Sequence, residues 1–307
     1  MSLARHNFIK RIRTLYTSIN QTDAVQSKEL HETEHNEIAR MLRNGLAVVG
    51  FASLEDFIKQ RSSEILDSIG MAGLSFGHLP EKVQIATTYG AISALNYQLN
   101  LRDNNEKIDF VQEHALKISS TMSSGYELTS LAFGYGQANL NSESIKTILT
   151  NFHISNPWGQ ITEIASSLGL AALPLNESFT NAALRRHKAA HVANADTPQG
   201  DISQFVNEAI SIAIGFDFLL SKALDKLKTH DLSYLDGSGK LSASDIIFRL
   251  IKHADGKWKE FIKGSVRAYR TSEDLEILVN DTKRRAVLAG QYYVQFDDKG
   301  VILDWAC

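Results

Sequence analysis

The spacing of apolar residues along the chain predicts helices over most of its length. Large apolar side chains recur three and four positions apart, and the whole sequence holds 4 prolines, a pattern typical of amphipathic helices. The longest stripe runs from Ile38 to Ile69 and predicts a helix over 36–69, kinked near Gly45 and Gly50. Further helices are expected near 80–99, 106–122, 141–153, 157–168 and 176–194, with Pro80 and Pro157 at first helical positions and Asn156 as an N-cap.

The stretch from Ile202 to Lys228 is apolar around much of a helical circumference. Such a helix must be buried on more than one side, either in the core of a bundle or against a partner chain. The polar segment DTPQGD at 196–201 separates it from the preceding helix.

The pattern changes after His230. The loop DLSYLDGSGK leads to two capping-box spacings, SASD at 242–245 and TSED at 271–274. Beyond Gly290 apolar and polar residues alternate, and DDKG then precedes VILDWAC, which predicts one terminal β-hairpin. We therefore expect a mainly α protein, with a helical domain over 1–230 and a small helix and hairpin extension over 231–307.

Composition narrows the possible classes. The chain has 307 residues, 43% of them hydrophobic and 22% charged, as in ordinary globular proteins. Its net charge of -3 lacks the overall basic excess of many nucleic-acid binders. Cys307 is the only cysteine, so no internal disulfide can form. With no signal-like apolar segment at the start and no long uncharged apolar span, we expect a cytoplasmic protein without a membrane segment.

Two weak motifs offer other chemistry. HETEH at 31–35 has the letters of a zinc peptidase helix, in which two histidines and a glutamate surround the metal, but its polar neighbours favour a solvated helix start. DGSGKLSAS at 236–244 lacks the earlier glycine of a phosphate-binding loop and reads as a linker. Zinc bound to the purified protein, and lost when His31 or His35 is changed, would support the peptidase alternative.

RHKAAH at 186–191 carries the most specific candidate chemistry. RNA cleavage without a metal needs groups that move protons and a fixed positive charge for the phosphate. Histidine suits proton transfer because its pKa lies near neutrality, and arginine can hold two phosphate oxygens. A metal shared by His187 and His191 is less favoured, because Arg186 and Lys188 would repel it. An ordinary basic helix end remains the plain alternative.

The spacing also constrains the geometry. Five helical steps place Arg186 and His191 roughly 140° apart around a straight helix. They can meet if the helix frays before His191, or if two copies of the chain each contribute part of one cleft across a symmetric interface.

The sequence resembles the HEPN superfamily of helical-bundle ribonucleases, especially its RiboL-PSP and stand-alone bacterial branches. RHKAAH fits the family signature of an arginine followed four to six residues later by a histidine, near the end of one helix and ahead of a long apolar helix. The segments at 39–61 and 148–169 also resemble the family's leading helices. The likeness covers about residues 36–228.

The resemblance implies a homodimeric, metal-independent endoribonuclease that forms a 2',3'-cyclic phosphate, often in toxin or antiphage systems and under an antitoxin or regulatory protein. It implies no cofactor, and RNA, including tRNA, as the partner. Arg186 would stabilise the phosphate, His191 would transfer protons, and His187 would take the polar position after the arginine. Val192 stands where the family often has glycine, and Ala193 where one branch has a modified tyrosine.

Nearby polar side chains extend the candidate RNA surface, with ordinary solvation as the alternative for each. These residues are Arg185, Lys188, Arg40, Arg43 and Asn44. The basic cluster at 283–285 is expected to be a solvated helix face. Because some HEPN proteins have lost catalysis, a noncatalytic module that binds RNA or a partner protein is the alternative function.

Overall fold

The computed structural model describes residues 2–170 and 174–306, and Cys307 lies outside this part. The prediction of a mainly helical bundle is confirmed. Its helices are α1 Leu3–Gln21, α2 Thr33–Gly70, α3 Glu81–Thr87, α4 Tyr89–Leu99, α5 Lys107–Ser120, α6 Ser142–Asn151, α7 Pro157–Ser167, α8 Leu175–His191, α9 Gln199–Lys228, α10 Leu232–Leu235 and α11 Leu275–Leu288. The strands are β1 Phe248–Ala254, β2 Lys257–Ile262, β3 Arg270–Ser272, β4 Tyr292–Phe296 and β5 Ile302–Ala306.

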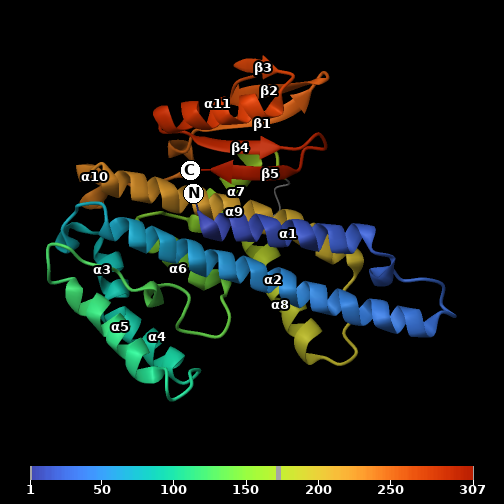
Figure 1. Cartoon of the computed structure of the whole chain (residues 1–307), viewed down its shortest axis with the longest axis horizontal. Helices are drawn as coiled ribbons and strands as arrows, with labels where there is room; N and C mark the ends of the chain where they lie inside the picture. Colours follow the sequence, from blue (N-terminus) through green and yellow to red (C-terminus); the bar gives the residue numbers. More distant parts are fainter. Residues whose placement is uncertain (1, 171–173, 307) are drawn as a thin grey trace.

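The apolar helix α9 lies at the centre of the molecule. It packs against α1, α2, α7 and α8, and Figure 1 shows it beside α1 and α2 beneath the C-terminal sheet. It is the one described helix long and apolar enough to cross a membrane. Of the 18-residue stretch of α9 that meets this criterion, 78% is buried inside the protein. This is the burial of a core helix, as the apolar pattern predicted.

Most helix boundaries lie close to the predicted ones, with a few differences. The predicted helix at 80–99 is divided at Thr88, whose φ of -113° and ψ of -108° are not helical. The helix predicted over 176–194 ends at His191, because Val192 is extended. Asn156 precedes Pro157 as expected but has φ +49° and makes no side-chain cap bond.

The C-terminal part contains more strand than the sequence predicted. The expected hairpin is present as β4 and β5, but these strands belong to a five-stranded sheet in the order β3-β2-β1-β4-β5. SASD makes its capping box around a single 3-10 turn at Ala243–Asp245, so no long helix follows there. TSED does lead to α11, with Asp274 as the N-cap.

The sheet packs closely on the helical bundle. The ring of Phe218 on α9 contacts Phe248 and Tyr292 at centroid distances of 6.2 and 4.9 Å. Trp305 on β5 contacts Phe8 and Phe57. One hydrophobic core therefore runs from α1 to β5, and the division at residue 230 stays a prediction.

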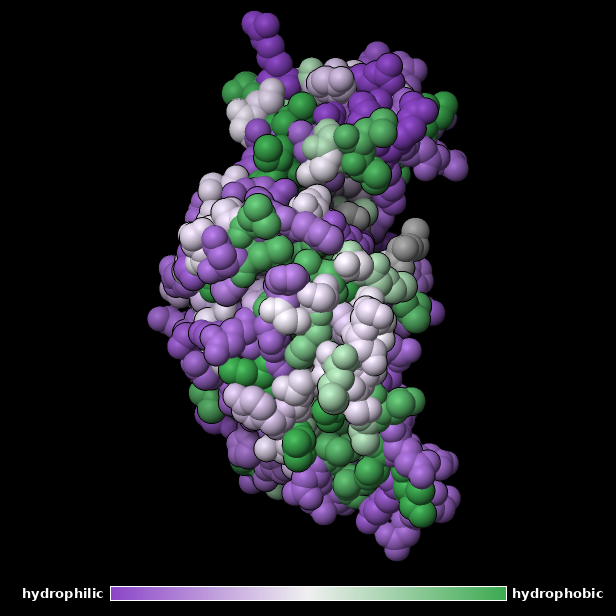
Figure 2. Space-filling view, turned by 90° about the vertical axis from the view of Figure 1, so that its left-hand side faces the viewer, coloured by the Kyte–Doolittle hydropathy of each residue, from purple (hydrophilic) through white to green (hydrophobic). Residues whose placement is uncertain are grey.

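The helices α3 to α5 form a lobe at the lower left of Figure 1. Figure 2 views this side of the molecule, and hydrophobic surface gathers toward its lower end. Exposed apolar side chains of the lobe include Ile92, Leu101, Ile108 and Leu116.

Candidate RNA-processing site

The C-terminal end of α8 carries all the residues of RHKAAH. The helix continues through His191, so the motif is helical throughout. His187 and His191, one turn apart, lie on the same face, with ring centroids separated by 4.8 Å. Both histidines are exposed, and no hydrogen bond joins either ring to another described residue. They are therefore accessible for proton transfer with a bound substrate.

Arg186 differs from the histidines in its surroundings. The residue is half-buried, and its Nε is buried without a hydrogen-bond partner among the described residues. A buried donor left unpaired is costly, since it loses its bonds to water. The Nε of Arg186 is thus a donor that the described part of the fold leaves unsatisfied.

Glu55 on α2 is the acidic group that sequence reasoning missed. It is only 6% exposed, and its Oε1 accepts a hydrogen bond from the Leu140 backbone N–H at 2.6 Å. Burial raises the pKa of Glu55, while the nearby charges of Lys59 and Arg186 act in the opposite direction. A signal was available in the sequence, because Glu55 lies between Leu54 and Phe57 within the apolar stripe of α2.

The neighbouring basic residues of α8 are placed differently. Arg185 faces α9, where its guanidinium lies 3.7 Å from Asp201 and 3.8 Å from Glu208. Lys188 is exposed and makes no ion pair with another described residue. Of these two cations, Lys188 is the more available to a phosphate.

Arg43 holds the loop that follows the motif. This side chain is 5% exposed and donates to the carbonyl oxygens of Thr197 and Val25 and to the Asp196 carboxylate, at 3.0, 2.9 and 2.7 Å. Its donors are thus engaged within the protein. These bonds position the loop, and an RNA contact by Arg43 stays a prediction.

Asn44 fastens the same loop. Its amide donates to the Ala195 carbonyl at 2.7 Å and accepts from the Thr197 backbone N–H and hydroxyl at 3.1 and 2.9 Å. Arg40, one turn earlier, is paired with Glu37 on the surface of α2. Of the three α2 candidates, Arg43 is buried, whereas Arg40 and Asn44 are half-buried.

The HETEH segment does not present two histidines on one helix. Because α2 begins at Thr33, His31 precedes the helix, and the His35 ring is hydrogen-bonded to the Gln26 carbonyl at 2.9 Å. In the described part of the chain, no group of three or more potential metal-ligating side chains is found.

The fold and the motif together define a class of protein: a helical bundle whose long core helix follows a short helix ending in an arginine and histidine motif. The family model RiboL-PSP-HEPN matches residues 7–222, which include every bundle helix from α2 to α8 and most of α9. The chain belongs to this family. Membership in the HEPN superfamily suggests a nuclease or another RNA-related activity. No curated protein and no solved structure gives a significant match.

Proposed function

We propose that this protein is a metal-independent endoribonuclease of cellular RNA. The observation that carries the proposal is the end of α8, where Arg186 has a buried Nε without a hydrogen-bond partner among the described residues and the rings of His187 and His191 are exposed. Arg186 would stabilise charge on the scissile phosphate. His191 would move a proton between the attacking 2'-hydroxyl and the leaving 5'-oxygen, giving a 2',3'-cyclic phosphate.

The active form is a homodimer in this proposal. Since α8 remains helical through His191, fraying does not bring Arg186 and His191 to one side, and a second copy can supply the missing partner. The flank of the motif also carries exposed apolar side chains on two adjoining helices, α2 and α8. They are Met41, Leu42 and Val49 on α2 and Leu184 on α8. Exposed apolar surface of this kind favours a protein interface.

The biological setting belongs to the same proposal. We place the activity in the cytoplasm, with tRNA or another structured RNA as substrate. A role as a toxin or antiphage effector, restrained by an antitoxin or another regulatory protein, rests on family membership. Growth arrest on expression of the wild type, absent with Arg186→Ala, would support that role.

The decisive experiment incubates tRNA and structured RNA with the purified protein in EDTA. We expect cleavage products with cyclic phosphate ends from the wild type and none from Arg186→Ala or His191→Ala. His230→Ala and Arg284→Gln, which change exposed residues elsewhere, are matched controls and should cleave normally. Equal cleavage by all variants would refute the site. RNA retention without cleavage would instead support the noncatalytic binding module.

The dimeric site can be tested by mixing the two inactive variants. If each site takes Arg186 from one protomer and His191 from the other, a mixed dimer regains one intact site, and random exchange restores about a quarter of wild-type activity. No recovery after proven exchange would mean that the site does not combine these residues across the interface.

A further inference from the structure

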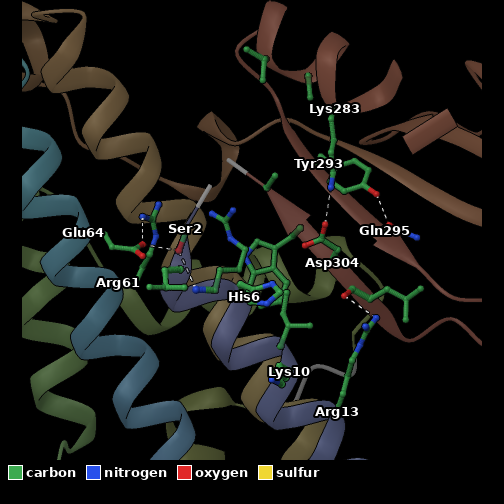
Figure 3. A pocket seen from close by; sticks show the side chains of 18 of the residues that line it. Ser2, His6, Lys10, Arg13, Arg61, Glu64, Lys283, Tyr293, Gln295 and Asp304 are labelled. Carbon is green, nitrogen blue, oxygen red and sulfur yellow. Dashed lines mark hydrogen bonds and ion pairs between the residues drawn. The ribbon is translucent and has the colours of Figure 1, made fainter. Parts of the chain in front are cut away.

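A large cavity lies between the helical bundle and the C-terminal layer. Its volume is about 1480 Å³, and it is lined by α1, the end of α2 and α9 on the bundle side and by α11, β4 and β5 on the other. Figure 3 shows His6, Lys10 and Arg13 along α1, with Lys283, Tyr293 and Asp304 across the cavity. The residues of RHKAAH are not among its described lining residues.

The sequence of α1 creates the cationic wall. Phe8, Ile12 and Leu15 recur at helical spacing and are buried in the core. His6, Lys10 and Arg13 share another helical face, because they are separated by four and three positions. All three are exposed and line the cavity. The amphipathic pattern of α1 therefore turns its basic stripe into this space.

The acidic groups around the cavity are largely neutralised. Asp217, in the core beneath it, is fully buried and accepts bonds from Arg5 and Arg61 at 2.7 and 2.6 Å. Glu64 accepts bonds from the Ser2 hydroxyl, the Ala4 backbone N–H and Arg61. Their charges thus do little to repel a bound anion.

Across the cavity, Asp304 is paired with Lys283 at 2.8 Å, whereas Asp67 makes no ion pair within the described ranges. Burial raises the pKa of Asp67.

The cations retain free hydrogen-bonding capacity. Lys10 and Lys228 are both exposed, both line the cavity, and neither makes an ion pair within the described ranges 2–170 and 174–306. Arg13 uses one guanidinium nitrogen to donate to the Leu303 carbonyl at 3.0 Å. These donors come from two separate helices, so they can hold a ligand with more than one negative oxygen.

We propose that this cavity binds a nucleotide bearing a polyphosphate. The ammonium groups of Lys10 and Lys228 and the remaining donors of Arg13 suit phosphate oxygens, while the hydroxyls of Thr14 and Thr17 suit a sugar. Apolar side chains of Ile9 and Val287 line the same space and can cover a base. The volume exceeds the roughly 300–1,000 Å³ of common small-molecule pockets, so a nucleotide fits. This site is separate from the proposed nuclease site and does not rest on it.

The experiment titrates the full-length protein with ADP, GDP, CDP and UDP by calorimetry, with pyrophosphate and adenosine as separate arms. We expect saturable binding of at least one nucleotide, much weaker binding of pyrophosphate, and none of adenosine. Lys10→Gln/Lys228→Gln should weaken that nucleotide about tenfold or more, since bonds to charged groups are lost.

The control is Arg11→Gln/Lys146→Gln, which removes the same charge from exposed residues outside the cavity lining. Its nucleotide affinity should equal that of the wild type, and both double variants should melt as the wild type does. The proposal is overturned if no nucleotide binds, if both double variants weaken binding equally, or if pyrophosphate binds as tightly as the nucleotide. It is also overturned if the cavity variant loses affinity for single-stranded RNA while the nucleotides do not bind.

Discussion

Two arginine sites in this molecule differ in how their donors are used. Around Asp217, Arg5 and Arg61 are almost fully buried and bonded to a carboxylate that also accepts from Trp305 Nε1 at 2.8 Å. At the end of α8, Arg186 has a buried Nε without a hydrogen-bond partner among residues 2–170 and 174–306, and His187 and His191 are exposed. Arginines whose donors are satisfied within the fold stabilise it, whereas a guanidinium that retains an unsatisfied donor is a candidate for binding a ligand.

The largest effect should come from the motif. His191→Ala is expected to lower the RNA cleavage rate by roughly 10² to 10⁴, the usual contribution of a general acid or base. Stability should change by less than about 0.5 kcal/mol, because the side chain is exposed. Single-turnover cleavage and urea denaturation measure the two quantities. A large loss of stability would instead show that His191 stabilises the fold, as the residues around Asp217 do.

Asp217 should show the opposite behaviour. Asp217→Ala leaves two buried arginines without their shared carboxylate, and breaking a buried pair costs about 3–5 kcal/mol of unfolding free energy. Asp304→Ala, which removes a half-buried partner of Lys283, should cost less than about 1 kcal/mol. Denaturant unfolding of both variants compares them, and similar losses would contradict the difference in burial.

The pH dependence of unfolding sharpens the same contrast. Burial opposes ionisation of Asp217, but the charges of Arg5 and Arg61 outweigh it and hold the pKa of this carboxyl well below its usual value. The stabilisation is complete above the unfolded pKa of about 3.9 and is lost as pH falls toward the folded value. Wild-type stability should therefore fall more steeply below pH 4 than that of Asp217→Asn. Parallel curves would exclude this carboxylate as the cause.

Arg43 provides an intermediate case near the motif. Arg43→Ala removes the bonds to Thr197, Val25 and Asp196, and we expect a loss of about 1–3 kcal/mol. Limited proteolysis should cut the loop at 192–198 faster in this variant than in Arg40→Ala, whose side chain pairs on the surface. Equal proteolysis would show that the loop does not depend on Arg43.

The smallest effect should come from Lys188. If it contacts a phosphate, Lys188→Ala weakens RNA binding uniformly and lowers the slope of log affinity against log salt by about 1. Arg185→Ala should change this slope less, since Arg185 already faces Asp201 and Glu208. Filter binding at several salt concentrations distinguishes the two.

The bundle was largely predictable because apolar residues recur every three or four positions along its helices. The stripe of α2 and the apolar circumference of α9 specify long, buried helices without reference to distant residues. Helix α1 was not predicted, although Phe8, Ile12, Leu15 and Ile19 recur at the same spacing. RHKAAH could be singled out as a candidate site because its residue types and spacing are local.

The first hairpin of the sheet was missed although Asp255 and Gly256 gave a local signal, since both have the positive φ that a tight hairpin turn requires. The other missed features depend on distant contacts. Nothing local distinguishes Arg43 from Arg40, and only the fold brings Thr197 to Arg43. The cluster at 283–285 was expected to be solvated, yet Lys283 and Arg285 pair with Asp304 and Glu260. Ion pairs between residues remote in sequence need the three-dimensional arrangement.

The bond between Asp217 and Trp305 has a consequence for how the protein is made. A ribosome delivers the chain from its N-terminus, so the helices of the bundle emerge well before β5. Until Trp305 has been synthesised, Asp217 lacks its indole partner, and Phe8 and Phe57 lack the ring that covers them. Completion of the core is therefore a late event in biogenesis, and a ribosome that stalls before β5 would hold an unfinished bundle.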